Sequence, residues 1–231
     1  MNSAQALPVL RFQLPDGTTA EATVKRLLNA GYAGKDQHEV QAHIDELAKL
    51  GVPVPGTTPT LYPVSPYLAQ QADRIDVQHS ETSGEAEWAI IVDNDGQVLI
   101  TCACDHTDRK LEAHGVAWSK NASPDVLGDR AWLYSDIAER FDEVILSSWV
   151  GEERMVIQEG SAASLLDPEY WLNILDERGE LEPGTVLLSG TIPMNAEVDQ
   201  FSSRWGVSLE DPEFGRISLE YDIVKMPAPV E

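Results

Sequence analysis

Basic residues are scarce in this sequence: 16 Lys and Arg residues stand against 39 Asp and Glu residues, a formal net charge of −23 over 231 residues. Nucleic-acid duplexes and anionic membranes repel a chain of this charge, so the composition argues against both as partners. The acidic residues are spread along the chain and gather in no single tail, which indicates a solvated acidic surface. The length is sufficient to bury one sizeable core.

Cysteine is nearly absent as well. Cys102 and Cys104 are the only two, and the single residue between them leaves no useful loop to close, so no disulfide framework is expected. The segment Met1–Leu14 lacks a basic start and a long apolar stretch, so no signal peptide is visible. The longest apolar run, Trp88–Val92, is too short to cross a bilayer. These absences predict a soluble, cytoplasmic protein.

Short apolar or alternating stretches, separated by turn residues, make up most of the chain after about Asp73 and predict strands. They are Trp88–Val92, Val98–Cys102, Val144–Trp149, Val186–Ser189, Arg204–Leu209 and Ile217–Val224. Another strand is expected at residues 8–13, followed by a turn at Asp16-Gly17. The predicted fold class is therefore α+β, mainly β, with decorating helices.

Helical spacing of apolar residues appears in the N-terminal part of the chain. The pattern becomes helical from about Ala20 to Leu50, most clearly in Glu39–Leu50, and Gly51 is expected to end that helix. Two further helices are expected at roughly Thr107–His114 and Leu166–Arg178.

Five prolines in Val52–Pro66 predict an extended, loop-like joint. We therefore expect a small N-terminal α+β cap with a proline-rich linker at residues 1–72, and a main domain at residues 73–231.

Three acidic residues are expected to converge on one hairpin. Glu85 and Glu87 are two positions apart, so in a strand they share a face. A three-residue loop at Asn94–Gly96 would pair Glu85 with Asp105 across the hairpin, whereas a two-residue loop would turn Asp105 to the other face. Three converging carboxylates make a hard oxygen site for Mg²⁺, Mn²⁺ or Ca²⁺.

Two other interpretations of this region stay open. An acidic protein can expose Glu-x-Glu on a strand edge without binding anything, or the cluster can be structural. Cys102, Cys104 and His106 also alternate on one face and could bind Zn²⁺, although two small buried cysteines in a core strand explain the pattern more simply.

Several polar residues outside the predicted metal ligands are candidates for binding or catalysis. Lys120 lies in a stretch poor in bases, and Glu112 could act as an acid or base. Gly190 would allow close backbone approach to a ligand, and Thr191 offers a hydroxyl beside it. Taken singly, each fits an ordinary structural or surface residue better than a functional one.

Taken in order, these pieces resemble the fumarylacetoacetate hydrolase superfamily over about residues 75–225, in a branch of unassigned activity. The matching stretches are Glu85-Ala86-Glu87, Cys104-Asp105-His106-Thr107-Asp108-Arg109-Lys110, Lys120, Gln158-Glu159-Gly160, Pro183-Gly184-Thr185 and Gly190-Thr191-Ile192-Pro193. Ile192 is an insertion relative to the family pattern.

The resemblance implies a β-barrel or roll, usually dimeric, with a divalent cation, Mg²⁺ or Mn²⁺, at its active site. By correspondence of motifs the ligands of this cation are Glu85, Glu87 and Asp105. The residues in contact with substrate are Arg109, Lys120, Gly190 and Thr191.

The same resemblance implies chemistry on a small 1,3-dicarbonyl or 2-oxo carboxylic acid. A metal chelated by two substrate oxygens polarises a carbonyl and stabilises an enolate as a C–C bond breaks. Lys120 would add positive charge where oxyanion charge develops. A nearby base, His106 or Glu112, could activate water, although neither has a clear counterpart in the family pattern. We therefore expect a metal-dependent C–C hydrolase or lyase, with decarboxylation and tautomerisation as related reactions. The alternative is a protein on the same scaffold that binds small carboxylates without turnover or acts as a tautomerase.

Overall fold

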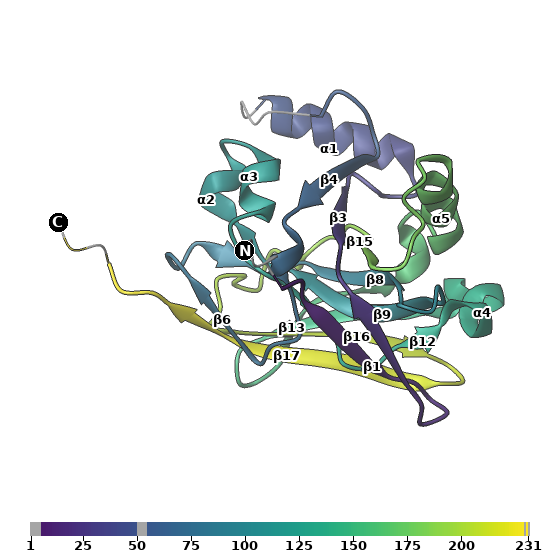
Figure 1. Cartoon of the computed structure of the whole chain (residues 1–231). Coiled ribbons are helices and arrows are strands. Elements are labelled where there is room, and N and C mark those ends of the chain that lie inside the picture. The colour runs from purple at the N-terminus through teal and green to yellow at the C-terminus, as the bar shows by residue number, and fades with distance from the viewer. Residues whose placement is uncertain (1–5, 50–54, 229, 231) are drawn as a thin grey trace, which may run out of the picture.

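The protein folds into two packed β-sheets with short helices around them (Figure 1). The computed structural model describes residues 6–49, 55–228 and 230. The larger sheet has the order β4 (Thr60–Val64), β3 (Arg26–Gly31), β15 (Thr185–Leu188), β8 (Ala86–Val92), β9 (Val98–Asp105), β11 (Asp125–Leu127) and β5 (Ala69–Gln70), and β9 also pairs with β12 (Trp132–Leu133).

The smaller sheet has the order β14 (Met155–Ser161), β13 (Ile145–Val150), β16 (Arg204–Asp211), β17 (Gly215–Lys225) and β6 (Arg74–Val77). Two short antiparallel pairs complete the strands. They are β1 (Val9–Gln13) with β2 (Thr19–Thr23), and β7 (Thr82–Ser83) with β10 (Thr107–Asp108).

The helices are short and lie at the margins of the sheets. They are α1 (Gln37–Lys49), α2 (Arg109–Glu112), α3 (Val116–Lys120), α4 (Tyr134–Ile137) and α5 (Pro168–Glu177), with 3₁₀ turns η1 (Pro66–Leu68), η2 (Ala138–Glu143) and η3 (Ala162–Ser164). Helix α5 begins where Asp167 accepts a hydrogen bond from the Tyr170 N–H at 2.9 Å, with Pro168 in its first turn. Among the described helices, none is long and apolar enough to cross a membrane.

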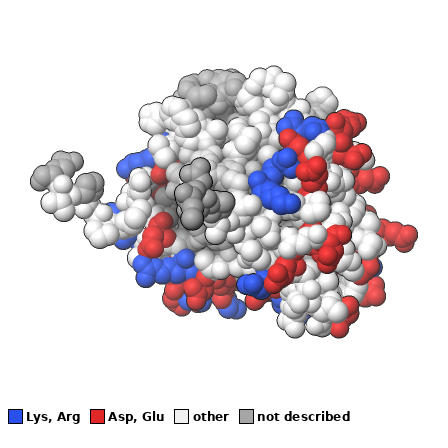
Figure 2. All heavy atoms as spheres, viewed as in Figure 1, with Lys and Arg blue, Asp and Glu red and all other residues white. Residues whose placement is uncertain are grey.

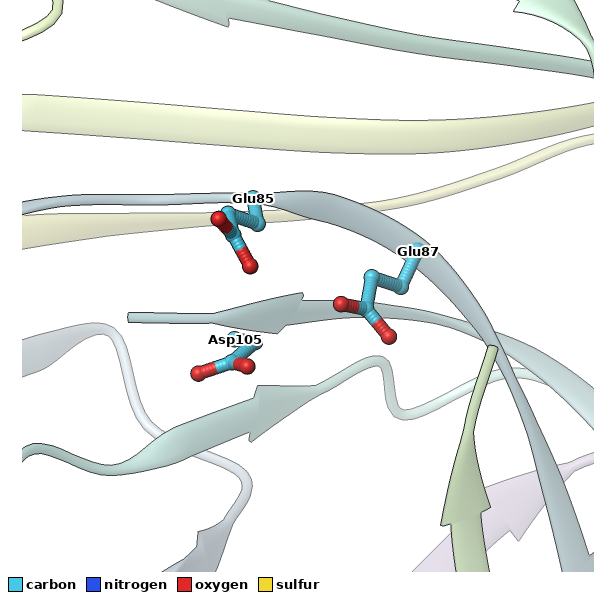
Figure 3. A group of neighbouring side chains, drawn as sticks. All are labelled: Glu85, Glu87 and Asp105. Atoms are coloured by element: carbon cyan, nitrogen blue, oxygen red, sulfur yellow. The ribbon is translucent and has the colours of Figure 1, made fainter. Parts of the chain in front are cut away.

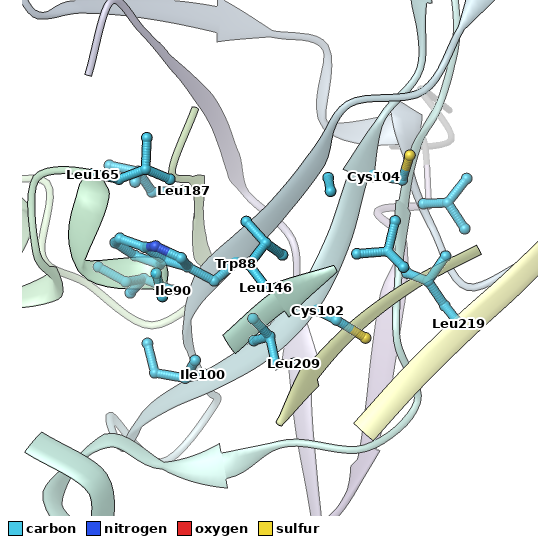
Figure 4. Packing of buried hydrophobic residues seen from close by; sticks show 14 of the residues in the cluster. Trp88, Ile90, Ile100, Cys102, Cys104, Leu146, Leu165, Leu187, Leu209 and Leu219 are labelled. Atoms are coloured by element: carbon cyan, nitrogen blue, oxygen red, sulfur yellow. The ribbon is translucent and has the colours of Figure 1, made fainter. Parts of the chain in front are cut away.

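Strand β8 is buried on both faces, and this decides where its polar residues can point. Trp88 and Ile90 face the core between the two sheets, together with Cys102 of β9 (Figure 4). Ala89 and Ile91 face a second cluster that includes residues of β1 and β2. Because strand residues alternate, the odd-numbered residues of β8 and β9 share the second face.

Most of the predicted elements are confirmed. All six strands named after Asp73 are present as β8, β9, β13, β15, β16 and β17, and the strand at residues 8–13 and the helix near Leu166–Arg178 are present as β1 and α5. The helix at about Thr107–His114 is only the short α2. The mainly β α+β fold class is therefore confirmed.

The helix expected from about Ala20 is wrong in its first half. That stretch forms β2 and β3, and α1 begins only at Gln37. The reason is that β3 lies inside the sheet with Leu27 and Leu28 both buried, so it lacks the alternation that marks a half-exposed strand. The expected cap at Gly51 lies outside the described residues.

The proline-rich joint contains a strand. Thr60–Val64 forms β4 at the edge of the larger sheet, where a proline such as Pro63 is tolerated. Strands from both sides of residue 72 belong to this one sheet, since β3 pairs with β4 and with β15. The division of the chain at residue 72 stays a prediction.

Charged residues border the face of the molecule seen in Figure 2. Acidic side chains lie mostly along its lower and right margins, with basic side chains among them. This distribution agrees with a solvated acidic surface.

An ion pair between the buried Asp211 of β16 and the partly exposed Arg140 of η2 gives stability that depends on pH. Burial alone would raise the pKa of Asp211, but hydrogen bonds from Arg140 and from the N–H groups of Phe214 and Glu213 outweigh it and lower the pKa. A depressed pKa means that the charged carboxylate stabilises the fold above its ordinary pKa of 3.8, and that this is lost as pH falls through the folded-state value. We expect Asp211→Asn to be destabilised at pH 7, with the gap to wild type closing in acid. Urea unfolding at several pH values measures this, and a gap that widens in acid would contradict it.

Candidate metal centre

The β8–β9 hairpin has the register that brings three carboxylates together. Glu87 lies opposite Ala103 and Ala86 opposite Cys104, while the Asp105 N–H donates to the Glu85 carbonyl at 3.1 Å. The connection is the predicted three-residue loop, closed by Gly96 with a φ of 83°. The predicted pairing of Glu85 with Asp105 is therefore confirmed.

The carboxylate cluster, defined as Glu85, Glu87 and Asp105, is shown in Figure 3, where the three side chains project into one space from neighbouring strands. One oxygen from each lies within 4.8 Å of the others. Glu87 and Asp105 are fully buried. Oε2 of Glu87 accepts the Gly190 N–H at 2.7 Å, but its buried Oε1 has no hydrogen-bond partner among the described residues. A buried, unpartnered carboxylate oxygen beside two further carboxylates fits a hard divalent cation.

The electrostatics of the cluster favour an added positive charge. Burial holds the pKa of Glu87 well above its usual value; the negative charges of Asp105 and Glu85 raise it further, against the opposing effect of Lys120. Burial acts in the same direction on Glu85, but Arg109 and Lys120 outweigh it and lower that pKa. The positive charges of Arg109 and Lys120 thus offset the negative charge of Glu85, but they do not offset that of Glu87.

Two basic side chains border the carboxylate cluster. Lys120, at the end of α3 and only 5% exposed, donates to Asp105 and lies 3.5 Å from Glu85. Arg109 donates to Glu85 and to Glu112, each at 2.9 Å. Both of these predicted residues, and Glu112, therefore lie at the cluster.

The position of Arg109 follows from a local capping interaction. The Asp108 carboxylate accepts the N–H groups of Lys110 and Leu111, each at 3.0 Å, and so starts α2 at Arg109. The first residue of the helix is thereby directed back towards Glu85.

Gly190 and Thr191 also lie beside the cluster, but their polar groups are already bonded within the protein. The Gly190 N–H binds Glu87, and the Thr191 hydroxyl donates to the Ala86 carbonyl at 2.8 Å. Gly190 has a φ of 83°, and a Cβ there would lie 3.2 Å from the Cβ of Ala33. These residues therefore position Glu87 and β8 in this structure.

His106 does not lie at the cluster. It is adjacent to Asp105 and so points to the opposite face, where its ring nitrogens lie 2.9 Å from the Tyr221 hydroxyl and 3.0 Å from the Thr82 hydroxyl. Burial lowers the pKa of His106 to about 3, so the ring is neutral. The geometry gives no support to His106 as the base that activates water.

The surroundings of Cys102, Cys104 and His106, the alternative set of zinc ligands, do not favour metal binding. Cys102 and Cys104 are buried in the core between the sheets, where burial raises the pKa of Cys102 to about 12. Cys104 accepts a hydrogen bond from Tyr221, and His106 is held by two hydroxyl groups. Among the described residues, the carboxylate cluster is the group of metal-ligating side chains close enough to share an ion.

Sequence reasoning missed two polar residues behind the cluster. Asp125 of β11 lies directly opposite Asp105, and its Oδ1 accepts the Asn29 amide at 3.1 Å. Burial and the charge of Asp105 raise the pKa of Asp125 well above its usual value. The sequence pattern that could have identified such residues is a single polar residue inside an otherwise apolar stretch, such as Asn29 between Leu28 and Ala30.

Gln158 was named only as part of a motif, and the structure gives it a structural role. Its side-chain carbonyl accepts the Ala86 N–H at 3.0 Å, and its amide donates to Thr191 at 2.8 Å and to the Ile192 carbonyl at 2.6 Å. It therefore ties β14 to β8 and to the turn after β15.

A large cavity lies beside the cluster, and Glu85 is the cluster residue that lines it. It has a volume of about 1270 Å³. Near the cluster it is lined by Glu85, Arg109, Glu112, Lys120, Gly190 and Thr191, and further polar lining residues are Lys35, Asp36, Gln37, His38, Glu39 and Ser164. Most of the lining away from the cluster comes from residues 30–40, which connect β3 to α1 and form the start of that helix.

A family model described as a protein of unknown function, DUF2848, matches residues 30–221. The chain belongs to the DUF2848 family. The match includes the carboxylate cluster, both basic residues and the cavity lining from β3 and α1. No curated protein matches the sequence.

Solved structures of low sequence identity share the fold. A 2-keto-3-deoxy-D-arabinonate dehydratase complexed with magnesium and 2,5-dioxopentanoate has a TM-score of 0.59 at 18% identity, over 87% of this chain and 73% of that one. A maleylpyruvate hydrolase from Sphingobium sp. SYK-6, in complex with manganese and pyruvate, has 0.60 at 16%, over 88% and 72%. A 5-carboxymethyl-2-hydroxymuconate delta-isomerase from Mycobacterium smegmatis has 0.61 at 16%, over 95% and 99%. The resemblance to the fumarylacetoacetate hydrolase superfamily is thus confirmed for the fold.

Proposed function

We propose that this DUF2848 protein is a divalent-metal-dependent enzyme acting on a small 2-oxo or 1,3-dicarbonyl carboxylic acid. The observation that carries the proposal is the convergence of Glu85, Glu87 and Asp105, with one buried Glu87 oxygen left without a partner. Mg²⁺ and Mn²⁺ prefer such oxygen ligands, and Ca²⁺ also accepts them. Two proteins of the same fold are described with such a metal and an oxo acid, which supports the same chemistry here.

The side chains around the cluster have separate roles in this proposal. A bound divalent cation supplies Lewis-acid polarisation of a substrate carbonyl. Lys120 holds a fixed positive charge beside Asp105 and Glu85, where it can stabilise negative charge that develops on substrate oxygen. Arg109 holds Glu85 and Glu112 in place and adds a second positive charge.

Glu112 is the proposed proton acceptor. It lines the cavity, and its carboxylate is oriented by Arg109 at 2.9 Å. A positioned carboxylate on the cavity wall can accept a proton from water or substrate. C–C hydrolysis is the proposed reaction, with decarboxylation and tautomerisation as the related ones.

The test is turnover of a panel of 2-oxo and 1,3-dicarbonyl acids by chelator-treated protein reloaded with Mn²⁺. We expect one or more acids to be consumed, EDTA to stop the reaction, and Lys120→Met to lower kcat by about a hundredfold or more in saturating Mn²⁺, as loss of a charge facing the transition state does. Glu177→Gln, an exposed carboxylate on α5, is the matched control and should retain activity.

The alternative function is binding of a small carboxylate without turnover. It would be favoured if oxo acids bind to the Mn²⁺-loaded protein, none is consumed, and binding persists in Lys120→Met and Glu87→Ala. If the Mn²⁺-loaded protein neither binds nor converts any acid of the panel, the proposal is wrong. A homodimer and a cytoplasmic location stay predictions.

A further inference from the structure

Two tyrosines line the cavity near the carboxylate cluster. Tyr32 directly follows β3 and has a φ of 56°, a backbone conformation that residues other than glycine rarely adopt. Tyr62 lies in β4, and its ring covers Gly31, since a Cβ at Gly31 would lie only 2.7 Å from its Cε2 atom. The chain therefore accepts an unfavourable backbone at Tyr32 and has no side chain at the preceding Gly31, and both features go with a tyrosine at the cavity.

Aliphatic side chains line the same cavity as these tyrosines, which is also lined by the charged or polar residues Lys35, Asp36, His38 and Glu39. The tyrosine wall, as we name it, consists of Tyr32, Tyr62, Val40, Val116, Leu165 and Ile192. Burial raises the pKa of both tyrosine hydroxyls, so the rings are uncharged. The Tyr32 hydroxyl has no hydrogen-bond partner among the described residues, and its ring supplies apolar surface.

The volume of the cavity is too large for a three-carbon acid. Cavities of about 300–1000 Å³ hold ligands of drug size, and this cavity has about 1270 Å³. A three-carbon acid bound at the carboxylate cluster and Lys120 would fill only a small part of this volume. A substrate that uses both the carboxylate cluster and the tyrosine wall needs a polar head and an apolar tail.

We propose that the tyrosine wall is a subsite for the tail of the substrate, and that the substrate is a 2-oxo acid bearing an aryl or conjugated apolar group. Planar groups stack on or pack edge-to-face against tyrosine rings. This inference rests on the proposed function, because the carboxylate cluster places the head. Tyr32 and Tyr62 then determine specificity without taking part in the chemistry.

The test compares two acids that share a head and differ in the tail. Pyruvate and phenylpyruvate are titrated calorimetrically into Mn²⁺-loaded protein, in wild type, Tyr32→Ala, Tyr62→Ala and the control Tyr67→Ala, a tyrosine that is 55% exposed and does not line the cavity. Burial of a phenyl group predicts that phenylpyruvate binds to wild type about tenfold or more tightly than pyruvate. We expect this preference to fall towards one in both cavity variants and to survive in Tyr67→Ala, while pyruvate affinity stays within about threefold throughout.

Conservative variants distinguish the contribution of the tyrosine rings from that of their hydroxyls, and they control for misfolding. Tyr32→Phe and Tyr62→Phe should keep the preference for phenylpyruvate, and Tyr62→Leu, which keeps an apolar side chain but loses the ring, should weaken it. Equal binding of the two acids to wild type, or a preference that survives both alanine variants, would overturn this inference alone. Failure of both acids to bind to Mn²⁺-loaded wild type would overturn the proposed function together with it.

Discussion

Glu87→Gln should lose Mn²⁺ affinity by about tenfold or more while the protein remains folded, since a hard cation loses one of three charged oxygen ligands. The amide oxygen of glutamine can still accept the Gly190 N–H, which binds Glu87 at 2.7 Å in the wild type. Burial already raises the pKa of Glu87 well above its usual value, so a neutral side chain there should cost the metal-free fold little. Loss of affinity would therefore report on the ligand and not on unfolding.

Calorimetric titration of chelator-treated protein with Mn²⁺ and Mg²⁺ is the measurement. Wild type should bind one ion, and Glu85→Gln and Asp105→Asn should be weakened as Glu87→Gln is. Glu177→Gln, which removes an exposed carboxylate outside the carboxylate cluster, should bind as wild type does. Unchanged affinity for Mn²⁺ and Mg²⁺ in all three cluster variants would contradict the proposed metal site.

Lys120→Met should destabilise the metal-free protein by about 3 kcal/mol or more, because removing one partner of a buried ion pair leaves a buried charge uncompensated. Lys120 is 5% exposed and is the basic partner of Asp105, whose side chain is fully buried. Methionine keeps most of the apolar length of the lysine stem, so the loss reflects the charge more than the packing.

Mn²⁺ should reverse much of this loss. A cation bound among Glu85, Glu87 and Asp105 supplies the positive charge that the variant lacks, and a ligand that binds only the folded state raises its stability. Urea unfolding with EDTA and with Mn²⁺ measures the difference. Lys110→Met is the control, since its ion pair with Glu81 is exposed and should contribute little. If Mn²⁺ stabilises Lys120→Met no more than it stabilises wild type, Lys120 does not offset the negative charge of the carboxylate cluster.

The carboxylate cluster itself could be predicted because the features that determine it lie close together in the sequence. Alternation within a strand puts Glu85 and Glu87 on one face, and the length of one turn decides which face Asp105 takes. Adjacent strand positions also point to opposite faces, so the distance of His106 from the cluster follows from its place next to Asp105. The prediction of His106 as a base used nearness in sequence and neglected this alternation.

The N-terminal part shows where local patterns fail. Residues 26–31 form a strand buried on both faces between β4 and β15, so their apolar residues do not alternate. Whether such a run is helix or strand depends on what covers it, and the covering strands come from residues 60–64 and 185–188.

By itself, then, the sequence determined the mainly β fold class, the β8–β9 hairpin with its register, and the convergence of three carboxylates, because each follows from backbone periodicity and turn length. Only the tertiary structure decided what surrounds them. The Gly190 N–H reaches Glu87 across 103 residues, and Asn29 reaches Asp125 across 96. Tyr32 and Tyr62 become one cavity wall only when β4 pairs with β3. Contacts over such separations depend on how the sheet closes around its core, and no short pattern of residues encodes that.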